Sequence, residues 1–524
     1  MKKSPAAIIV FFAIAGTLVA QNRVSEAVVG KPYPFFDSNS EFYISGSSGF
    51  LIVKPWAKTV ILQKIGNDLT MQKATEYKQF PKDFEVRAVR TLGKKSYLFY
   101  SAPSGDKMSL FAAQLDLDKG ELMEGGREIV TSSDDIKKET FSGREFQFLQ
   151  SDDSSHFAVC YRIKSRKLDK SKSYEVNGLW VFDDQLNELW HNEVALPYTE
   201  KKCDVRGRGI DTQGNIHTAI SIMKDDSGVE KKIDEDFPNY SLQLLTFTKG
   251  SSEAVATPFN LKDKFIKNIS INGTSEKIIC SGFYDSHQLN ENPQGTFVFF
   301  VAGGVSSETR LQPFSLPVVN EGLGKIKQKL NESKAKKNKP LDIDNLKLVD
   351  VTIQTDGSIL IQGEEQVAAV APRAVPSPST PGDFSSTMGS PARSENLLII
   401  KILPDGNLAW TRKIIKSQLT PLNGASYQYW QGNDSDFNFL FIEGDELIQY
   451  NLDPNTGLGE KQILTRFKPL LKKPVSSHAL FLNRIAITPD KNSVVVETKV
   501  SGDAGRFGEV KLYKDNVLVK VPVR

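Results

Sequence analysis

Few residues of this chain combine the types and spacings that metal-dependent chemistry requires. Its five histidines stand singly, at positions 156, 191, 217, 287 and 478, so none forms the pair four residues apart that binds zinc on a metalloprotease helix. Asp434, Asp436 and Asn438 resemble the start of a calcium loop, but Phe439 occupies the position where such a loop needs glycine. The sequence therefore predicts no metal and no cofactor.

The motifs of nucleophilic catalysis are missing as well. Residues 45–49 read Ser-Gly-Ser-Ser-Gly, which lacks the Gly-x-Ser-x-Gly spacing of a hydrolase nucleophile. Adjacent carboxylates such as Asp152-Asp153 and Asp183-Asp184 fall in predicted turns, where aspartate bonds to the backbone. These residues favour a protein that is not an enzyme. The alternative is an enzyme that gathers its catalytic groups from distant segments.

The composition argues against nucleic-acid binding and against a disulfide scaffold. The chain has 524 residues, with 66 lysines and arginines against 63 aspartates and glutamates. A nucleic-acid partner would be indicated by a strong positive excess, so we expect none. The three cysteines match no zinc or redox spacing, and Cys160 and Cys280 lie in apolar, strand-like runs. We expect these two to be buried structural thiols.

The N-terminus has the pattern of a secretory signal peptide over residues 1–20. Lys2 and Lys3 precede an apolar run over residues 6–19, which ends at Ala20 before polar Gln21. The run is shorter than the roughly 20 residues that span a bilayer as a helix. We expect cleavage between Ala20 and Gln21, and a mature chain without a transmembrane segment in the periplasm, on the outer-membrane surface or outside the cell. An uncleaved anchor is the alternative.

The rest of the chain reads as short strands separated by tight turns. Runs such as 97–100 and 297–300 are rich in aromatic and β-branched residues, and turn signals such as Asp356-Gly357 separate such runs. Aligned with one another, they form four-stranded antiparallel repeats of roughly 40–70 residues. The repeats start near Tyr33, Phe84, Phe146, Cys203, Phe265, Leu346, Tyr427 and Phe481.

These repeats predict an all-β fold, a β-propeller of seven or eight four-stranded antiparallel blades. It extends over residues 48–524, and residues 21–47 lead into the first blade. A closed ring explains how so many strands avoid exposed edges. The alternative architecture is two or three tandem β-sandwiches.

One segment carries a family resemblance. Residues 400–410 read Ile-Lys-Ile-Leu-Pro-Asp-Gly-Asn-Leu-Ala-Trp. This run resembles the outer hairpins of quinoprotein-type propeller repeats. At the level of the fold, residues 40–524 are similar to uncharacterised secreted propeller proteins of Gram-negative bacteria. The resemblance implies an architecture and supplies no catalytic residues.

The connections between strands point to one face of such a ring. If the strands of a blade are called A to D, the B–C and D–A connections share one face, which we call the B–C face. The B–C loops are long and dissimilar, whereas the other turns are short. Because rigid scaffolds present irregular loops for binding, we expect a protein or glycan partner of the cell envelope to bind there. The candidate contact residues are Lys167, Tyr284, His287, Lys325 and Lys329.

Two insertions interrupt the repeats. Residues 319–346 are lysine-rich and helical over 321–339, and Leu323, Ile326 and Leu330 form an apolar stripe that we expect to dock on a blade. Residues 365–395 are rich in Pro, Ala and Ser and are expected to be disordered.

Two other functions stay open at this point. One is a propeller hydrolase or lyase that acts on an extracellular polymer, with residues that converge at the mouth of the central channel. His217 is a candidate for the channel in that case. The other is a purely structural surface protein.

Overall fold

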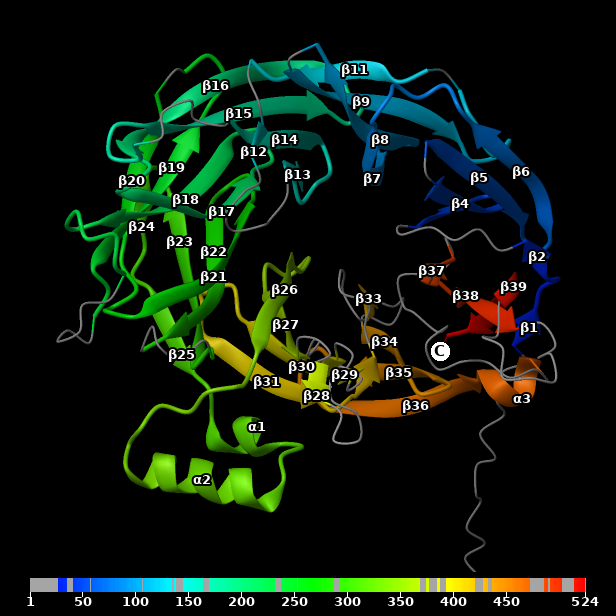
Figure 1. The fold of residues 1–524 in the computed structure, drawn as a ribbon. Coiled ribbons are helices and arrows are strands. Elements are labelled where there is room, and N and C mark those ends of the chain that lie inside the picture. Colours follow the sequence, from blue (N-terminus) through cyan, green and yellow to red (C-terminus); the bar gives the residue numbers. More distant parts are fainter. Residues whose placement is uncertain are drawn as a thin grey trace, which may run out of the picture.

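The computed structural model describes residues 27–34, 41–56, 58–105, 107–123, 125–133, 136–137, 145–163, 169–230, 237–251, 253–286, 292–367, 374–376, 384–386, 393–419, 427–431, 436–471, 485–488, 491–501 and 513–523. In these residues, eight antiparallel sheets stand around a centre as the blades of a closed propeller (Figure 1). The prediction of a seven- or eight-bladed propeller is confirmed with eight blades, and the alternative of tandem β-sandwiches is wrong.

Blades 1 to 4 follow one another along the chain, and their strands are given from the centre outward. Blade 1 contains β3 (Phe42–Gly46), β4 (Gly49–Trp56), β5 (Thr59–Gly66) and β6 (Met71–Tyr77). Blade 2 contains β7 (Glu85–Leu92), β8 (Lys95–Ser104), β9 (Lys107–Asp116) and, both paired with β9, β10 (Glu121–Leu122) and β11 (Arg127–Thr131). Blade 3 contains β13 (Phe146–Gln150), β14 (His156–Ile163), β15 (Tyr174–Asp183) and β16 (Glu188–Thr199), with β12 (Ile136–Lys137) beside β14. Blade 4 contains β17 (Cys203–Ile210), β18 (Ile216–Met223), β19 (Tyr240–Phe247) and β20 (Val255–Phe259).

Blades 5 to 8 continue the same order. Blade 5 contains β21 (Phe265–Gly273), β22 (Ile278–Asp285), β23 (Gly295–Ala302) and, both paired with β23, β24 (Val305–Ser306) and β25 (Arg310–Pro313). Blade 6 contains β26 (Leu346–Ile353), β27 (Ile359–Val367), β30 (Arg393–Ile402) and β31 (Leu408–Ile414), with β32 (Gln418–Leu419) beside β30. Blade 7 contains β33 (Gln428–Gln431), β34 (Phe437–Glu443), β35 (Glu446–Leu452) and β36 (Gly459–Arg466), and α3 (Phe467–Leu471) follows it. Blade 8 contains β37 (Ile485–Ile487), β38 (Ser493–Ser501) and β39 (Tyr513–Pro522).

The outermost strands of blade 8 come from the other end of the chain. β1 (Val28–Val29) and β2 (Tyr33–Pro34) both pair antiparallel with β39, so that Tyr33 lies opposite Asn516. Tyr33 therefore belongs to the eighth blade, and the first blade begins at Phe42 rather than near Tyr33. One sheet that holds both ends of the described chain closes the ring.

The turns opposite the B–C face share a hydrogen-bond pattern that explains the aspartates of the sequence. Asp211 Oδ1 accepts hydrogen bonds from the backbone N–H groups two and four residues further on, at 2.9 and 2.8 Å. Asp183 makes the same two bonds in blade 3, at 2.9 and 2.8 Å. Aspartate thus serves the backbone in these turns, as the sequence predicts.

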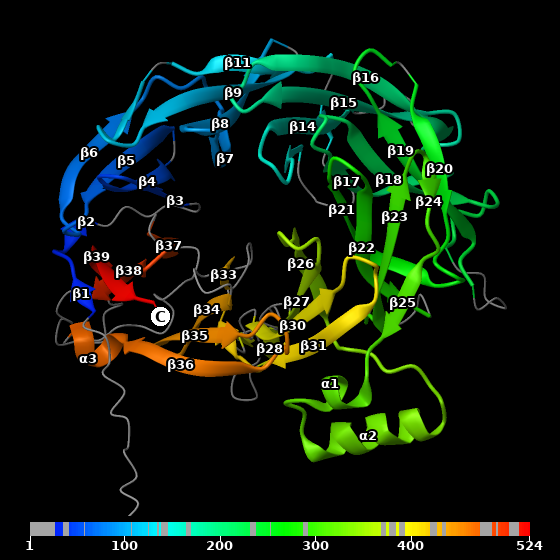
Figure 2. The same cartoon turned by 180° about the vertical axis from the view of Figure 1, so that it is seen from behind.

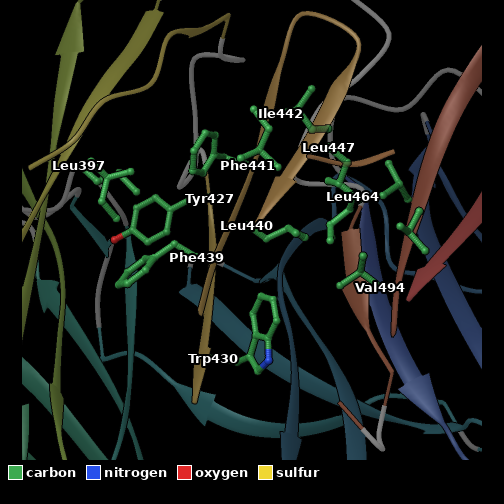
Figure 3. Packing of buried hydrophobic residues seen from close by; sticks show 14 of the residues in the cluster. Leu397, Tyr427, Trp430, Phe439, Leu440, Phe441, Ile442, Leu447, Leu464 and Val494 are labelled. Atoms are coloured by element: carbon green, nitrogen blue, oxygen red, sulfur yellow. The ribbon is translucent and has the colours of Figure 1, made fainter. Parts of the chain in front are cut away.

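The hydrophobic core lies between neighbouring blades. Figure 3 shows one such cluster, in which Leu397 of blade 6, Phe439 and Leu447 of blade 7 and Val494 of blade 8 pack together. Cys160 and Cys280 are buried in the strands predicted for them, and Cys203 is buried too. Burial raises the pKa of the Cys203 thiol to about 12.

The lysine-rich insertion forms two helices where the sequence predicts one. α1 (Leu316–Asn320) and α2 (Lys325–Lys336) make a hairpin that lies outside the ring between blades 5 and 6 (Figures 1 and 2). Gly322, with a φ of 77°, lies in the break between them, in a backbone conformation that favours glycine. The expected docking of the apolar stripe is wrong, because Ile326 is 87% exposed and Leu330 is 58% exposed.

The Pro-rich interruption is described only in part. β27 runs to Val367 and β30 starts at Arg393, so the ends of the range 365–395 belong to blade 6. Between them, β28 (Ala374–Pro376) pairs with β29 (Phe384–Ser386). The rest of this range lies outside the described residues, and its expected disorder stays a prediction.

Candidate functional site

Buried and partly buried charged side chains gather on the B–C face. They pair at the ends of the strands, around the ring from blade 8 to blade 6. The pairs are Lys54–Glu497, Arg87–Glu145, Arg206–Glu230, Lys267–Asp285 and Lys416–Glu364. Removing a charge from water is costly even when the charge is paired. The fold nevertheless buries several such pairs on this face.

A β-bulge that recurs in four blades positions three of these cations. In blades 2, 4, 5 and 6 the first strand contains one extra residue relative to the second strand, namely Arg87, Arg206, Lys267 and Val349. A bulge re-aims the side chain of its extra residue. The three cationic side chains are only 15%, 17% and 20% exposed. The first strand of each blade is the one nearest the centre of the ring (Figure 1). Arg87, Arg206 and Lys267 each occupy the third or fourth position of that strand, so the bulges place a cation at a similar position in three blades.

The partners of the two arginines occupy equivalent positions. Ser101 and Ser221 each lie opposite the residue that is two positions before the bulge. Arg87 Nε donates a hydrogen bond to Ser101 Oγ at 2.7 Å, and Arg206 Nε donates one to Ser221 Oγ at 2.9 Å. Burial would lower the pKa of Arg206, but the neighbouring Glu230 and a second carboxylate outweigh this effect and raise it. Arg206 therefore stays charged, and the hydrogen bonds to the two serines hold both arginines in place.

The same position carries a carboxylate in blades 5 and 6. Asp285 pairs with the bulge cation Lys267 at 3.4 Å. In blade 6 the bulge residue is the uncharged Val349, and Glu364 pairs instead with Lys416, which follows the fourth strand, at 2.8 Å. The side chains of Glu364 and Lys416 are both 0% exposed, and burial lowers the pKa of Lys416. A cation is thus supplied from another strand where the bulge lacks one.

Blades 3 and 4 are joined by a denser charged group. Arg162, at the end of β14, contacts Glu175 at 2.8 Å and Glu200 at 3.3 Å. From blade 4, Arg208 donates a hydrogen bond to Asn177, and both side chains are buried. This group fixes the B–C ends of two adjacent blades against each other.

A second group, which we call the closure cluster, lies where the ring closes and consists of Tyr33, Glu41, Tyr43, Lys54 and Glu497. Lys54 Nζ lies 3.1 Å from Glu497 Oε1 and 3.8 Å from Glu41 Oε1, and all three side chains are nearly or completely buried. The hydroxyls of Tyr33 and Tyr43 also donate hydrogen bonds to Glu497. One carboxylate thereby connects β2, blade 1 and blade 8.

A polar cleft of about 390 Å³ separates the α1–α2 hairpin from blade 6 on the B–C face. Three ion pairs line it: Lys327 with Asp344 at 3.0 Å, Lys334 with Asp342 at 2.6 Å, and Lys413 with Glu365 at 2.6 Å. Asn396 donates a hydrogen bond to Glu365 at 3.0 Å, and Glu395 and the apolar Val319 and Ile343 complete much of the lining. The cleft is therefore rich in donors and acceptors, and most of its charges are paired.

The inward side of α2 explains why its apolar residues point outward. Asn331 donates a hydrogen bond to Asn320 Oδ1 at 2.9 Å, and Gln328 donates one to the carbonyl oxygen of Leu323 at 2.8 Å. Asn331 is also the buried residue of this helix. These polar contacts, and not the apolar stripe, hold α2 to the molecule.

A larger hollow of about 550 Å³ lies at the outer edge between blades 5 and 6, lined in part by Lys262, Glu308, Arg310 and Asp405. Its ion pair, Lys262–Glu308, is 51% and 81% exposed. It is an open depression without the buried charges of the cleft, so we do not choose it as the candidate site.

The central channel holds two carboxylates from different blades. Asp152 follows β13 and Asp350 lies on β26, and both are exposed to solvent. Although both side chains reach solvent, the protein atoms around them partly desolvate them and raise the pKa of both. A hydrogen bond from Asn272 lowers the pKa of Asp152, and the charges of Asp153 and Asp350 raise it. Tyr429, from blade 7, has its pKa raised by burial to about 12. These groups make the channel the second candidate site.

His217 does not point into the channel. It lies in β18, the second strand of blade 4, and is 1% exposed. Its ring nitrogens lie 3.0 Å from Asp211 Oδ2 and 3.0 Å from Thr246 Oγ1. It is a buried histidine whose hydrogen bonds are satisfied, which corrects its place as a channel candidate. Among the described residues, no group of three or more His, Cys, Asp or Glu side chains is placed to hold a metal ion.

The structure places some of the sequence-predicted contact residues and not others. Lys325 and Lys329 lie exposed on α2. Tyr284 is 4% exposed in β22, and burial raises its pKa to about 12, so its ring packs in the core instead of facing a partner. Lys167, His287, Ala20 and Gln21 lie outside the described residues. No helix of the described chain is both long and apolar enough to span a membrane.

Sequence reasoning missed the charged groups of the B–C face. The adjacent Glu364 and Glu365 end an apolar strand, and Arg206 and Arg208 alternate with small residues in another. A charged residue inside an otherwise apolar strand was the available signal, because a buried charge requires a partner. The partners lie on neighbouring strands or blades, and their identity depends on the register.

The fold and its charged face define an eight-bladed β-propeller with a polar cleft. No protein-family model matches the chain, and no curated protein matches it. Among solved structures it is similar to a prolyl endopeptidase (TM-score 0.38, 11% identity, 91% of this chain and 55% of that chain). It is also similar to prolyl oligopeptidase B from Galerina marginata (TM-score 0.36, 9% identity, 92% and 54%) and to the apocarotenoid oxygenase of Synechocystis (TM-score 0.36, 11% identity, 72% and 71%). The chain spans about half the length of the two prolyl peptidases, and likenesses this weak carry no argument about its activity.

Proposed function

We propose that this protein is an exported, non-catalytic β-propeller that binds a protein or glycan partner of the cell envelope through its B–C face. The observation that carries the proposal is the series of buried and partly buried ion pairs around that face, together with the polar cleft beside blade 6, which includes the buried pair Lys413–Glu365. Buried ion pairs contribute little net stability, whereas they hold side chains in fixed geometry. A fixed polar surface is what a specific interaction requires.

The lining of the cleft favours an uncharged polar partner group. Its lysines are each paired with a carboxylate within 3.0 Å, so a free ion would have to displace an existing partner. Sugar hydroxyls or backbone amides, in contrast, can donate to the carboxylates and accept from Asn396 or the lysines without breaking those pairs. The volume of about 390 Å³ lies within the range of pockets that hold a small ligand or part of a larger one.

Site-specific photocrosslinking in the native envelope tests this proposal. A photoreactive residue is placed at Asp344 or Glu395 on the cleft, and in a matched pair at Asn187 or Asn455 in turns of the opposite face. We expect one discrete adduct from the cleft positions and none from the opposite turns. Adducts from the opposite face alone, or no adduct from either cleft position, would contradict binding through the B–C face.

Export is part of the same proposal and rests on the leader-like residues 1–20. Mass spectrometry of the protein recovered from its own cells should give a chain that begins at Gln21. A full-length chain recovered from the cytoplasm would refute export.

A second candidate function is a hydrolase or lyase that acts on an extracellular polymer. It is favoured by Asp152 and Asp350, two carboxylates with raised pKa that share the channel with Tyr429. A carboxyl group with a raised pKa suits general acid catalysis. Polymer cleavage that Asp350→Asn abolishes, while the protein stays folded, would establish this function over the first.

A further inference from the structure

The outward side of α2 carries apolar side chains that the described structure leaves uncovered. Ile326 is 87% exposed, and Leu330, one turn further along at the rim of the cleft, is 58% exposed. On an ordinary surface helix such residues face the core. Here the inward side is occupied by the hydrogen bonds of Gln328 and Asn331 and by the Lys334–Asp342 pair, so rotation of the helix to bury them would break those contacts.

Exposed lysines lie along the same helix and just after its end. Lys325, Lys329, Lys336, Lys337 and Lys339 are exposed, and none of them forms an ion pair with another described residue. Glu332 is the one acidic residue within α2. The lysines that do have carboxylate partners, Lys327 and Lys334, are those that line the cleft. The outward side of α2 is therefore both apolar and strongly cationic.

We propose that α2 docks this protein on the surface of an anionic phospholipid bilayer. The helix lies in the plane of the headgroups, Ile326 and Leu330 enter the boundary of the acyl chains, and the lysines contact lipid phosphates. Apolar residues flanked by lysines on one helix are the pattern of such interfacial helices, and each lysine near an anionic surface adds to the attraction. The hairpin protrudes from the ring, so a flat surface reaches it past the blades (Figure 2).

The size of the surface favours lipid over an acidic protein. Two side chains on a helix of 12 residues offer far less area than the roughly 800 Å² per partner that a stable protein interface buries. A bilayer needs no matching shape, because it adapts to an inserted side chain. Leu330 also borders the cleft, but Ile326, Lys329 and Lys336 do not line it, so this inference does not depend on the partner proposed for the cleft.

Vesicle co-sedimentation tests the proposal with residues 21–524, a chain that lacks none of the described elements. The probes are vesicles of pure phosphatidylcholine and vesicles in which part of it is replaced by phosphatidylglycerol. We expect sedimentation with the anionic vesicles only, weakened by salt. Ile326→Ser with Leu330→Ser should lower the partition coefficient by about tenfold or more, because the apolar contribution is lost. Lys329→Glu with Lys336→Glu should lower it to a similar extent.

Matched controls distinguish docking through α2 from nonspecific adsorption of the protein to vesicles. Val255 and Val305 are 61% and 71% exposed on the outer strands of blades 4 and 5, and changing both to Ser should leave sedimentation unchanged. Thermal unfolding establishes that each variant is folded. Equal binding to both kinds of vesicle, no binding to either, or anionic binding that the α2 variants leave intact would each overturn the proposal. An acidic protein captured through α2 without vesicle binding would also overturn it.

Discussion

Removal of the charge of Glu497 should loosen the ring where it closes. This carboxylate accepts hydrogen bonds from Tyr33 and Tyr43 and pairs with Lys54 at 3.1 Å. The side chains of Lys54 and Glu497 are both 0% exposed. Glu497→Gln keeps the size of the side chain and removes the charge, so that Lys54 is left with Glu41, 3.8 Å away, as its carboxylate.

The size of the effect follows from these distances. Breaking a buried ion pair by removing one partner typically costs about 3–5 kcal/mol, because the other charge stays buried without compensation. Since Glu41 remains within 4 Å of Lys54, we expect the low end, about 3 kcal/mol. At about 1.4 kcal/mol per factor of ten, opening of the closing sheet becomes on the order of a hundredfold more frequent.

Hydrogen exchange of the peptide that contains β39 measures this opening, since its backbone pairs with β1 and β2. We expect exchange to be roughly a hundredfold faster in Glu497→Gln. The triple variant Glu41→Gln, Lys54→Met and Glu497→Gln removes all three buried charges of the cluster and should recover most of the protection. The matched control is Lys262→Met, which breaks an exposed pair and should change stability by less than about 1 kcal/mol.

Two results would refute the reasoning. If Glu497→Gln exchanges at the wild-type rate, the closure cluster does not hold the ring. If the triple variant is no better protected than the single one, the cost does not come from an uncompensated buried charge.

Three further predictions concern other parts of the fold. Burial acts to raise the pKa of Asp211, but hydrogen bonds from His217 and from the side chain and backbone N–H of Asn215 outweigh this effect and lower the pKa. The stability that Asp211 contributes is therefore present above pH about 4 and lost as the pH falls through its folded pKa. Between pH 5 and pH 3 the unfolding midpoint of Asp211→Asn should therefore change less with pH than that of the wild type. Gly209→Ala should destabilise blade 4 by more than about 2 kcal/mol in denaturant titrations, because the new Cβ would lie 1.9 Å from a backbone oxygen of β21. The control is Gly125→Ala, whose Cβ would have no atom within 4 Å and which should be nearly neutral. The three buried cysteines should resist a thiol reagent in the native protein and react fully once it is unfolded, and prompt labelling of the native chain would contradict their burial.

The blade order was predictable because each blade repeats the same series of short apolar runs separated by tight turns. Phe146, Cys203, Phe265 and Leu346, proposed as the starts of repeats, are the first residues of β13, β17, β21 and β26. The predicted start of the first blade at Tyr33 is wrong for a topological reason, because the strand that contains Tyr33 pairs with β39, from the other end of the described chain. Nothing local in the sequence indicates a pairing over that separation.

The candidate site was harder to predict, because its contacts depend on register and on neighbouring blades. The B–C face was chosen from its irregular loops, but the bulges that position Arg87 and Arg206 insert a single residue into a strand and leave no separate sequence motif. The orientation of α2 was predicted from the apolar stripe alone. The hydrogen bonds of Gln328 and Asn331, whose partners lie just before α2, hold the polar side of the helix inward instead.

The sharing of the last blade between both ends of the chain has a consequence for the order of folding. During synthesis, β1 and β2 emerge first, but their partner β39 emerges after every other described strand. The early strands must wait unpaired while seven blades are made, and no intermediate that lacks the last strand can be a closed ring. A chain with this topology stays open until β39 has been made, and the step that completes the ring is the pairing of β39 with β1 and β2.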